Sequence, residues 1–214
     1  MKNIDVSKYE IFIFDCDGVI LNSNKLKNNF FIKAVNQYSS AEKLKFEKFI
    51  KLNKGLSRYK FFEEFYLKII KINKEEYKNS YIKSLNIYNK EINKNYIKCK
   101  YVPGVIKFIK KYQNKHMYVI SGSNQIELNK LFKKKDIFKY FKKIYGSPNS
   151  KSDNASKLIK KIKSKKILYF GDSYIDYKVS KILKSKFVFI SGYSDDTKLY
   201  KYKNIYKFKD FLKF

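Results

Sequence analysis

The sequence predicts an α/β fold in which a doubly wound parallel sheet carries an inserted helical segment. Over most of the chain, short apolar runs that end in polar residues alternate with helical patterns, and such alternation produces a parallel sheet with right-handed crossovers. Residues 23–95 break the alternation, because they contain no convincing strand and their apolar residues recur at spacings of three and four. At 214 residues, the chain is long enough to form one sheet-bearing domain with a smaller insert.

The elements of the sheet-bearing part follow from the order of these runs. Residues 9–14 are almost continuously apolar, which is typical of a central parallel strand. Pro103 opens a helix that continues to about residue 112. Residues 205–212 are expected to form a closing helix. Four further strands, separated by helical segments, are expected near residues 117–120, 143–145, 166–170 and 186–190.

The insert accounts for the rest of the chain. Apolar residues at helical spacing, such as Phe61 and Phe65, predict three or four helices packed as a small bundle. We therefore expect a core domain made of residues 1–21 and 98–214, and an inserted helical domain at residues 22–97.

Two carboxylates stand at the mouth of the first strand. Asp15 and Asp17 lie two residues apart and therefore point to the same side of an extended backbone, and Gly18 then allows the chain to turn away. Because like charges repel and ionised carboxylates are disfavoured in an apolar setting, the pair requires a nearby cation. The Asp-x-Asp-Gly pattern therefore indicates a metal-assisted catalytic site.

Three later segments also place polar residues where an apolar strand ends. Ser121 and Gly122 follow one strand, and the N–H groups there can hold phosphate oxygens. Lys151 follows the next short apolar run, while Asp172 and Asp176 flank the turn from the fourth strand into a helix. Since open parallel sheets bind ligands at the carboxyl ends of their strands, we expect these groups to share one site.

In this order, the four segments resemble the signature motifs of the haloacid dehalogenase superfamily. The resemblance covers the chain apart from residues 22–97, where that superfamily often carries an insert, and it implies a Rossmann-like sheet core with an α-helical cap domain. Within the superfamily, the chain is most similar to the phosphoglycolate phosphatase and β-phosphoglucomutase-like group, because the loop from Gly55 to Arg58 resembles the cap loop found there.

The resemblance implies a role for each motif residue. Asp15 is the nucleophile that attacks phosphorus to form an aspartyl-phosphate, and Asp17 is the acid and base. Lys151 supplies positive charge, while Ser121 and the N–H of Gly122 hold the transferring oxygens.

A hard cation such as Mg²⁺ is expected in the same site. A phosphate dianion and an aspartate nucleophile repel one another, and a divalent cation would neutralise both. The resemblance implies that Asp15, Asp172 and the backbone carbonyl of Asp17 bind the metal, with Asp176 completing or orienting its shell. In the alternative interpretation, Asp172 only caps the following helix and Asp176 is a surface residue one turn later.

Arg58 is the only arginine among 49 Lys and Arg residues. With Gly55 as a hinge and Ser57 as a helix cap, we interpret Ser57 and Arg58 as substrate-binding residues of the cap loop, with the guanidinium as a planar fork for an anion or a hydroxyl pair. The alternative is a residue at the start of a helix that makes a surface ion pair.

The reaction follows from the acid at Asp17. In the superfamily, an aspartate at this position points to phosphatases and phosphomutases, which must protonate an alkoxide leaving group. We expect a Mg²⁺-dependent phosphatase that hydrolyses a small phosphate monoester, such as a phosphosugar or a phosphoglycolate-like metabolite. A β-phosphoglucomutase-like mutase is the alternative, although Lys27 stands where that group has a histidine. Lys151 also departs from the superfamily motif, since Ser152 follows it in place of proline.

The net charge of +30 allows a third hypothesis, a basic nucleic-acid-binding protein on an inactive scaffold. Lysine, asparagine and isoleucine are all abundant, which is typical of an AT-rich genome, and a nucleic-acid-binding protein would use more arginine. No stretch is apolar for long enough to span a membrane, and the N-terminus lacks the apolar core of a signal peptide. We therefore expect a cytoplasmic monomer or weak dimer whose partner is a small phosphorylated metabolite.

Overall fold

The computed structural model describes residues 4–194 and 196–214, and it contains one sheet of six parallel strands. The strand order is β3-β2-β1-β4-β5-β6, so the chain starts in the middle and winds outward in both directions. This arrangement confirms the predicted doubly wound α/β fold. The strands are β1 (Ile11–Phe14), β2 (His116–Asn124), β3 (Lys143–Ser147), β4 (Ile167–Gly171), β5 (Lys186–Ile190) and β6 (Tyr206–Phe208).

Helices cover both faces of the sheet, and the alternation of side chains along β1 shows why the strand is apolar throughout. Phe12 and Phe14 pack into one cluster with residues of α5 and α6, whereas Ile11 and Ile13 pack into a second cluster with residues of α7, α8 and α9. The helices are α5 (Val105–Lys111), α6 (Gln125–Lys134), α7 (Lys151–Ile159), α8 (Tyr174–Ile182) and α9 (Thr197–Tyr200), with short 3₁₀ turns at Val6–Lys8, Tyr96–Lys98 and Phe138–Tyr140.

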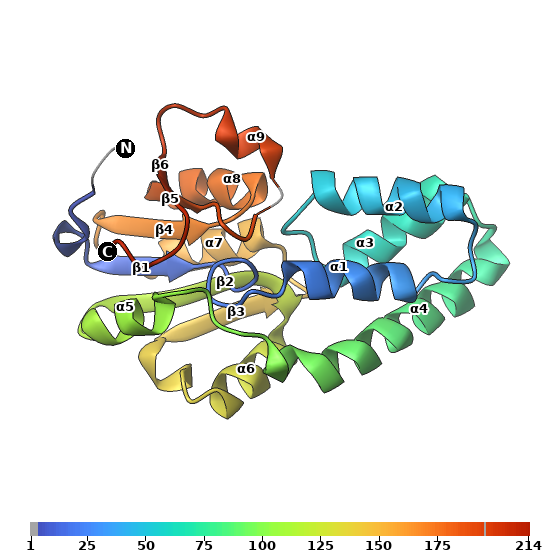
Figure 1. The fold of residues 1–214 in the computed structure, drawn as a ribbon, viewed down its shortest axis with the longest axis horizontal. Helices are drawn as coiled ribbons and strands as arrows, with labels where there is room; N and C mark the ends of the chain where they lie inside the picture. Colours follow the sequence, from blue (N-terminus) through green and yellow to red (C-terminus); the bar gives the residue numbers. More distant parts are fainter. Residues whose placement is uncertain (1–3, 195) are drawn as a thin grey trace.

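Residues 22–97, which we call the helical segment, lie beside the sheet rather than on either of its faces (Figure 1). Every residue of this segment is described, and none forms a strand. Its aromatic side chains pack on one another, and the centroid of the Phe31 ring lies 4.3–6.2 Å from those of four other rings. They are continuous with the buried cluster that holds Phe12 and Phe14 of the sheet. The expected bundle is confirmed, with α1 (Asn24–Lys33), α2 (Ser40–Leu52), α3 (Arg58–Glu64) and α4 (Lys74–Asn95), and a π-helix at Phe65–Ile70 follows α3.

The two ends of the helical segment meet in a short antiparallel stem. Leu21 forms an isolated bridge with Tyr101, and the Asn22 N–H donates to the Lys100 carbonyl at 2.9 Å. The chain therefore leaves the sheet after β1 and returns before α5 at neighbouring points, so an insertion here does not disturb the pairing of β1 with β2.

The tail differs from the prediction. Residues 205–212 were expected to form a closing helix, but Tyr206–Phe208 form β6, which pairs in parallel with β5. The edge of β5 supplies backbone partners that a helix could not use, since the N–H of Ser191 donates to the carbonyl of Phe208 at 2.8 Å. Phe208 and Phe211 then reach the core cluster shared with α5. The predicted closing helix was therefore wrong, because a three-residue edge strand has no periodicity to reveal it.

Candidate active site

Three buried carboxylates converge at the carboxyl edge of the sheet. Asp15 directly follows β1, Asp172 directly follows β4, and Asp176 lies in the first turn of α8. One carboxylate oxygen from each of the three lies within 4.8 Å of the others. Asp15 Oδ1 is buried and accepts no hydrogen bond of regular geometry from the described residues, although Lys151 Nζ lies 3.0 Å away. A buried cluster of hard oxygen donors fits a divalent cation such as Mg²⁺.

Lys151 lies against this cluster at the start of α7. Its Nζ is 3.0 Å from Asp15 Oδ1 and 2.7 Å from Asp176 Oδ1, and its side chain is only 2% exposed. The helix starts at this residue because Ser150 and Asp153 form a capping box. Although Ser152 stands in place of the proline of the superfamily motif, the ammonium group of Lys151 still lies at the site.

The crowding of negative charge perturbs the acidity of the cluster. Burial raises the pKa of Asp15 well above its usual value, although Lys151 opposes this shift. Burial and the neighbouring Asp176 raise the pKa of Asp172 to about 7. Because a raised pKa means that the ionised form is disfavoured, Lys151 alone does not supply enough positive charge to stabilise these carboxylates in their ionised form.

Asp17 points into a different set of contacts. Its Oδ2 accepts from Lys27 Nζ at 2.5 Å and from Ser123 Oγ at 2.9 Å, and its Oδ1 accepts from Ser23 Oγ at 2.5 Å and Tyr96 OH at 2.7 Å. Burial alone would raise its pKa, but the Lys27 ammonium and these hydrogen bonds lower the pKa to about 2. The Asp17 carboxylate is thus ionised and lies outside the three-carboxylate cluster.

The helix cap after β4 is made by Ser173 rather than by Asp172. Ser173 Oγ accepts from the Asp176 N–H, and Asp176 reciprocates as the third residue of a capping box. Asp176 is fully buried and also accepts from Tyr169 OH at 2.9 Å. It therefore takes part in both the helix start and the carboxylate cluster, and it is not a surface residue.

The end of β2 brings small residues to the same place. Ser121 is fully buried, and its Oγ accepts from the Ser123 N–H at 3.1 Å. Gly122 lies against the loop before α3, because a Cβ on Gly122 would stand only 2.7 Å from the Gly55 carbonyl oxygen and 2.9 Å from that of Leu56. Only glycine allows this close approach.

The cap-loop residues have partners that the sequence does not reveal. Ser57 is the N-cap of α3 and accepts from the Lys60 N–H at 3.3 Å. Arg58 is buried, and its guanidinium makes a two-pronged ion pair with Glu127 of α6, with Nη1 2.8 Å from Oε1. The guanidinium also donates to Asn89 and stacks on Tyr88, 4.7 Å from the ring centroid. Arg58 therefore opens a helix and makes an ion pair, as in the alternative interpretation, but the pair is largely shielded from solvent and does not lie on the surface.

A cavity of about 70 Å³ lies between the sheet edge and the helical segment. Asp15, Lys151 and Gly122 line it from the sheet, and Lys27 and Arg58 line it from the helical segment. Most of the sequence-predicted site residues therefore line one cavity, whereas Ser57, Ser121 and Asp176 are not among its lining residues. Sequence reasoning missed Ser123, Tyr96 and Glu127. Ser123 could have been predicted, because it lies two residues beyond Ser121 in the same segment, whereas no local sequence pattern marks Tyr96 or Glu127.

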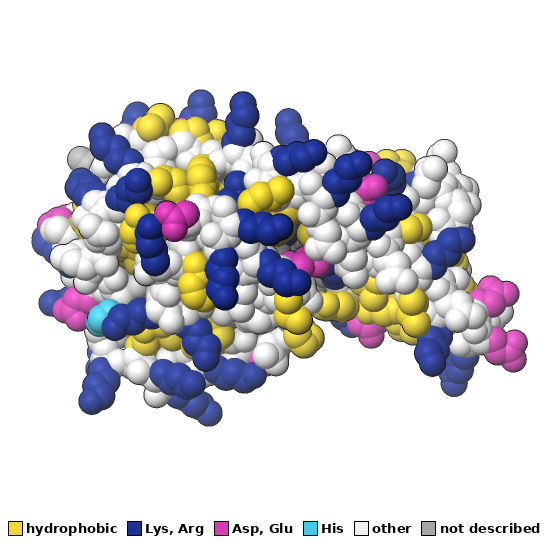
Figure 2. Space-filling view, turned by 90° about the horizontal axis from the view of Figure 1, so that it is seen from below, with side chains coloured by type: hydrophobic (Ala, Val, Ile, Leu, Met, Phe, Trp, Pro, Cys, Tyr) yellow, Lys and Arg dark blue, Asp and Glu magenta, His cyan; other side chains and the backbone are white. Residues whose placement is uncertain are grey.

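The lysines that dominate the composition do not gather into one patch on the face shown in Figure 2. They are spread over the sheet-bearing part and the helical segment, with apolar and uncharged areas between them. Among the helices of residues 4–194 and 196–214, none is long and apolar enough to cross a membrane.

Comparison with known proteins places this chain in a family. Residues 12–190 match the family described as haloacid dehalogenase-like hydrolase. The chain belongs to this hydrolase family. The resemblance drawn from the four motifs is thereby confirmed, and the family makes the protein an enzyme. Among curated proteins, none matches the sequence.

Solved structures of the same fold cover nearly the whole chain. One from Haemophilus somnus, described as a predicted phosphoglycolate phosphatase, is 18% identical with a TM-score of 0.73, over 95% of each chain. One from Clostridium acetobutylicum, described as a predicted phosphatase, is 15% identical with a TM-score of 0.71, over 93% of each chain. A haloacid dehalogenase-like hydrolase from Streptococcus pneumoniae is 16% identical with a TM-score of 0.68, over 94% of each chain. At these identities the likeness concerns the fold.

Proposed function

We propose that this hydrolase is a Mg²⁺-dependent phosphatase that cleaves a small phosphate monoester through an aspartyl-phosphate intermediate. The observation that carries the proposal is the buried group of Asp15, Asp172, Asp176 and Lys151, of which all but Asp176 line the cavity. The names of the structural relatives as phosphatases point in the same direction. In this proposal, residues 1–21 and 98–214 are the catalytic core and residues 22–97 are its cap domain.

The metal would be held by the carboxylates of Asp15 and Asp172, with Asp176 orienting that group and the Asp17 backbone carbonyl as a further oxygen donor. When bound, Mg²⁺ would supply the positive charge that allows a phosphate dianion to approach an aspartate. Lys151 adds a second, fixed positive charge on the same side, because it is already paired with Asp15 and Asp176.

Asp15 would act as the nucleophile. One of its oxygens forms a bond to phosphorus while the bond between phosphorus and the ester oxygen breaks, and the alcohol leaves. The N–H of Gly122 and the hydroxyl of Ser121 would hold the other phosphoryl oxygens during the transfer. Water then attacks the aspartyl-phosphate, which releases phosphate and regenerates Asp15.

Asp17 would transfer the protons in both halves of the reaction. In the second half, its ionised carboxylate would accept a proton from the attacking water in exchange for one of its four present donors. In the first half, it must give a proton to the departing alcohol. The negative charge of a bound phosphoester raises the pKa of a nearby carboxyl group, which favours the protonated form at that stage.

The small cavity, of about 70 Å³, favours a compact substrate such as a phosphoglycolate-like acid or a small phosphosugar. Lys27 and Arg58 line the cavity from the cap side, whereas Ser57 caps α3 and does not line it. We propose that the cap side selects the leaving group.

The test is release of inorganic phosphate from a broad panel of phosphate monoesters, measured with Mg²⁺ and with a chelator. We expect Mg²⁺-dependent release that Asp15→Asn abolishes. Asp136→Asn is the matched control, because the Asp136 side chain is 84% exposed and does not line the cavity. The absence of release with every panel member, or full activity of Asp15→Asn, would contradict the proposal.

The same panel addresses the alternative of a phosphosugar mutase, which the likeness of the Gly55 to Arg58 loop favours. A mutase would convert one sugar phosphate into another with little free phosphate, and traces of a bisphosphate would activate it. Phosphate release that matches substrate loss mole for mole would identify a hydrolase.

A further inference from the structure

Arg58 and Glu127 form a buried ion pair that joins the helical segment to the sheet-bearing part. Arg58 opens α3, and Glu127 lies in the first turn of α6, which follows β2. Their side chains are only 3% and 16% exposed, so each charge depends on the other for neutralisation. The planar guanidinium meets the carboxylate at two points, which fixes orientation as well as distance.

Two further contacts lie beside this pair. Asn124 caps α6 and donates from Nδ2 to the Tyr59 hydroxyl at 2.8 Å. Gly122 admits the Gly55 carbonyl at close range. The loop before α3 and the start of α3 are therefore fastened to the end of β2 and the start of α6, which is the part of the chain that lines the cavity through Gly122 and Ser123.

The guanidinium of Arg58 already has its charge neutralised in this arrangement. Nη1 and Nη2 both donate to the Glu127 carboxylate, and Nη1 also donates to Asn89 Oδ1. The Tyr88 ring covers one face of the guanidinium plane. A substrate anion could use Arg58 fully only by displacing Glu127, which would leave a shielded carboxylate without a partner. The geometry favours a pair that stays intact while the cavity is closed.

We infer that Glu127 is a positioning residue for catalysis, which latches the helical segment over the active site through Arg58. The inference rests on the proposed function for its kinetic part. It assigns Arg58 primarily to closure of the site rather than to direct grip on the substrate, and it gives Glu127, on α6, a role that no motif indicates.

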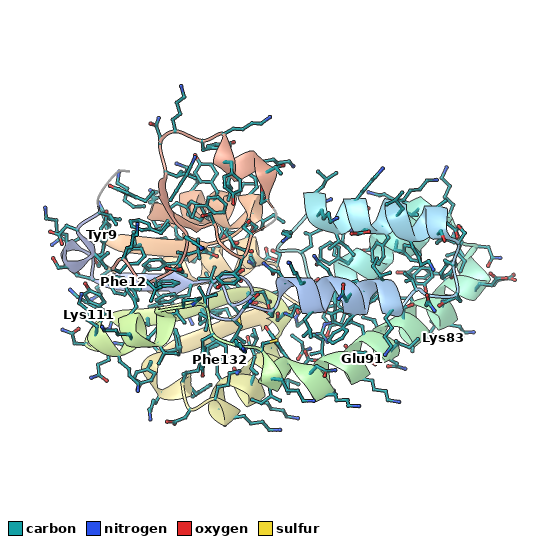
Figure 3. The ribbon with its side chains drawn as sticks, in the orientation of Figure 1. Tyr9, Phe12, Lys83, Glu91, Lys111 and Phe132 are labelled. Carbon is teal, nitrogen blue, oxygen red and sulfur yellow. The ribbon has the colours of Figure 1, made fainter. Side chains whose placement is uncertain are left out.

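The latch can be tested without activity. Spin labels on cysteines introduced at Lys83 and Lys111 would report the distance between α4 and α5, because these two residues stand at opposite ends of the molecule (Figure 3). Both native cysteines are buried. We expect a single narrow distance distribution for the parent chain and a broader, longer one for Glu127→Gln and for Arg58→Met. The matched control is Glu91→Gln, since Glu91 pairs with Lys33 at 2.6 Å inside the helical segment and does not reach the sheet.

Kinetics with the best phosphate ester then separates a latch from a substrate grip. A latch predicts that Glu127→Gln and Arg58→Met each lower kcat/KM at least about tenfold, and that the double variant is no worse than either single one. A direct grip predicts that Glu127→Gln lowers KM, because it frees Arg58, and leaves the distance distribution narrow. That result, or additive effects in the double variant, would overturn the inference. If the parent chain released no phosphate, the proposed function would fail while the distance measurement would still decide on the latch.

Discussion

Replacement of Lys151 by methionine should destabilise the metal-free protein strongly. The ammonium lies 3.0 Å from Asp15 and 2.7 Å from Asp176, with all three side chains at most 5% exposed. At an effective dielectric constant of 20, each attraction is about 6 kcal/mol before the cost of burying the charges. Because that cost offsets much of the gain, removal of one partner of a buried pair typically costs about 3–5 kcal/mol. We expect a loss in that range for Lys151→Met.

The assay is urea unfolding followed by far-UV circular dichroism, since the chain has no tryptophan. Measurements with a chelator and with saturating Mg²⁺ are compared, and Mg²⁺ should reduce the loss because it neutralises the same carboxylates. Lys166→Met is the matched control: its ion pair with Glu10 is 3.3 Å long, with side chains 66% and 51% exposed, so we expect a loss of less than about 1 kcal/mol. If the two variants lost equal free energy of unfolding, the reasoning on the buried cluster would be refuted.

Three further changes test other parts of the site. Mg²⁺ should raise the thermal unfolding temperature of the parent chain but not of Asp172→Asn, and an equal rise in both would speak against this residue as a ligand. The folded-state pKa of Asp17 is lowered from 3.8 to about 2, so its stabilisation is fully present above pH about 4 and is lost as the pH falls through about 2. The free-energy advantage of the parent chain over Asp17→Asn should therefore shrink by about 2 kcal/mol across that range in urea unfolding, and a constant difference would contradict the pKa. Gly122→Ala places a Cβ 2.7 Å from the Gly55 carbonyl oxygen and should cost about 1–3 kcal/mol in the same measurement, whereas an unchanged stability would show that the loop moves away freely.

The fold was predictable where local pattern and burial agree. β1 and β4 are buried on both faces, so they appear in the sequence as continuous apolar runs, and each ends directly before an aspartate. Asp15, Asp172 and Lys151 could be assigned to one site because parallel strands end at the same edge. The tail at residues 205–212 could not be predicted, because three residues of edge strand depend on a partner, β5, that is distant from them in any local window.

The contacts between the helical segment and the sheet were also beyond local pattern. Arg58 stood out by composition, but its partner Glu127 is 69 positions away, and a glutamate near a helix start is ordinarily explained by the helix itself. The direction in which Asp17 points was equally hidden. Lys27 and Tyr96 hold its carboxylate from opposite ends of the helical segment, and only the folded chain brings those ends together.

The antiparallel stem at Leu21 and Tyr101 is where the helical segment joins the rest of the chain. The two ends of this segment meet at one point, so its length and helix count can change in evolution while β1 and β2 keep their register. Under the proposed function, the residues at the sheet edge carry out the reaction and those of the helical segment select the substrate. Replacement of the helical segment could then produce new substrate specificities while the reaction stays the same.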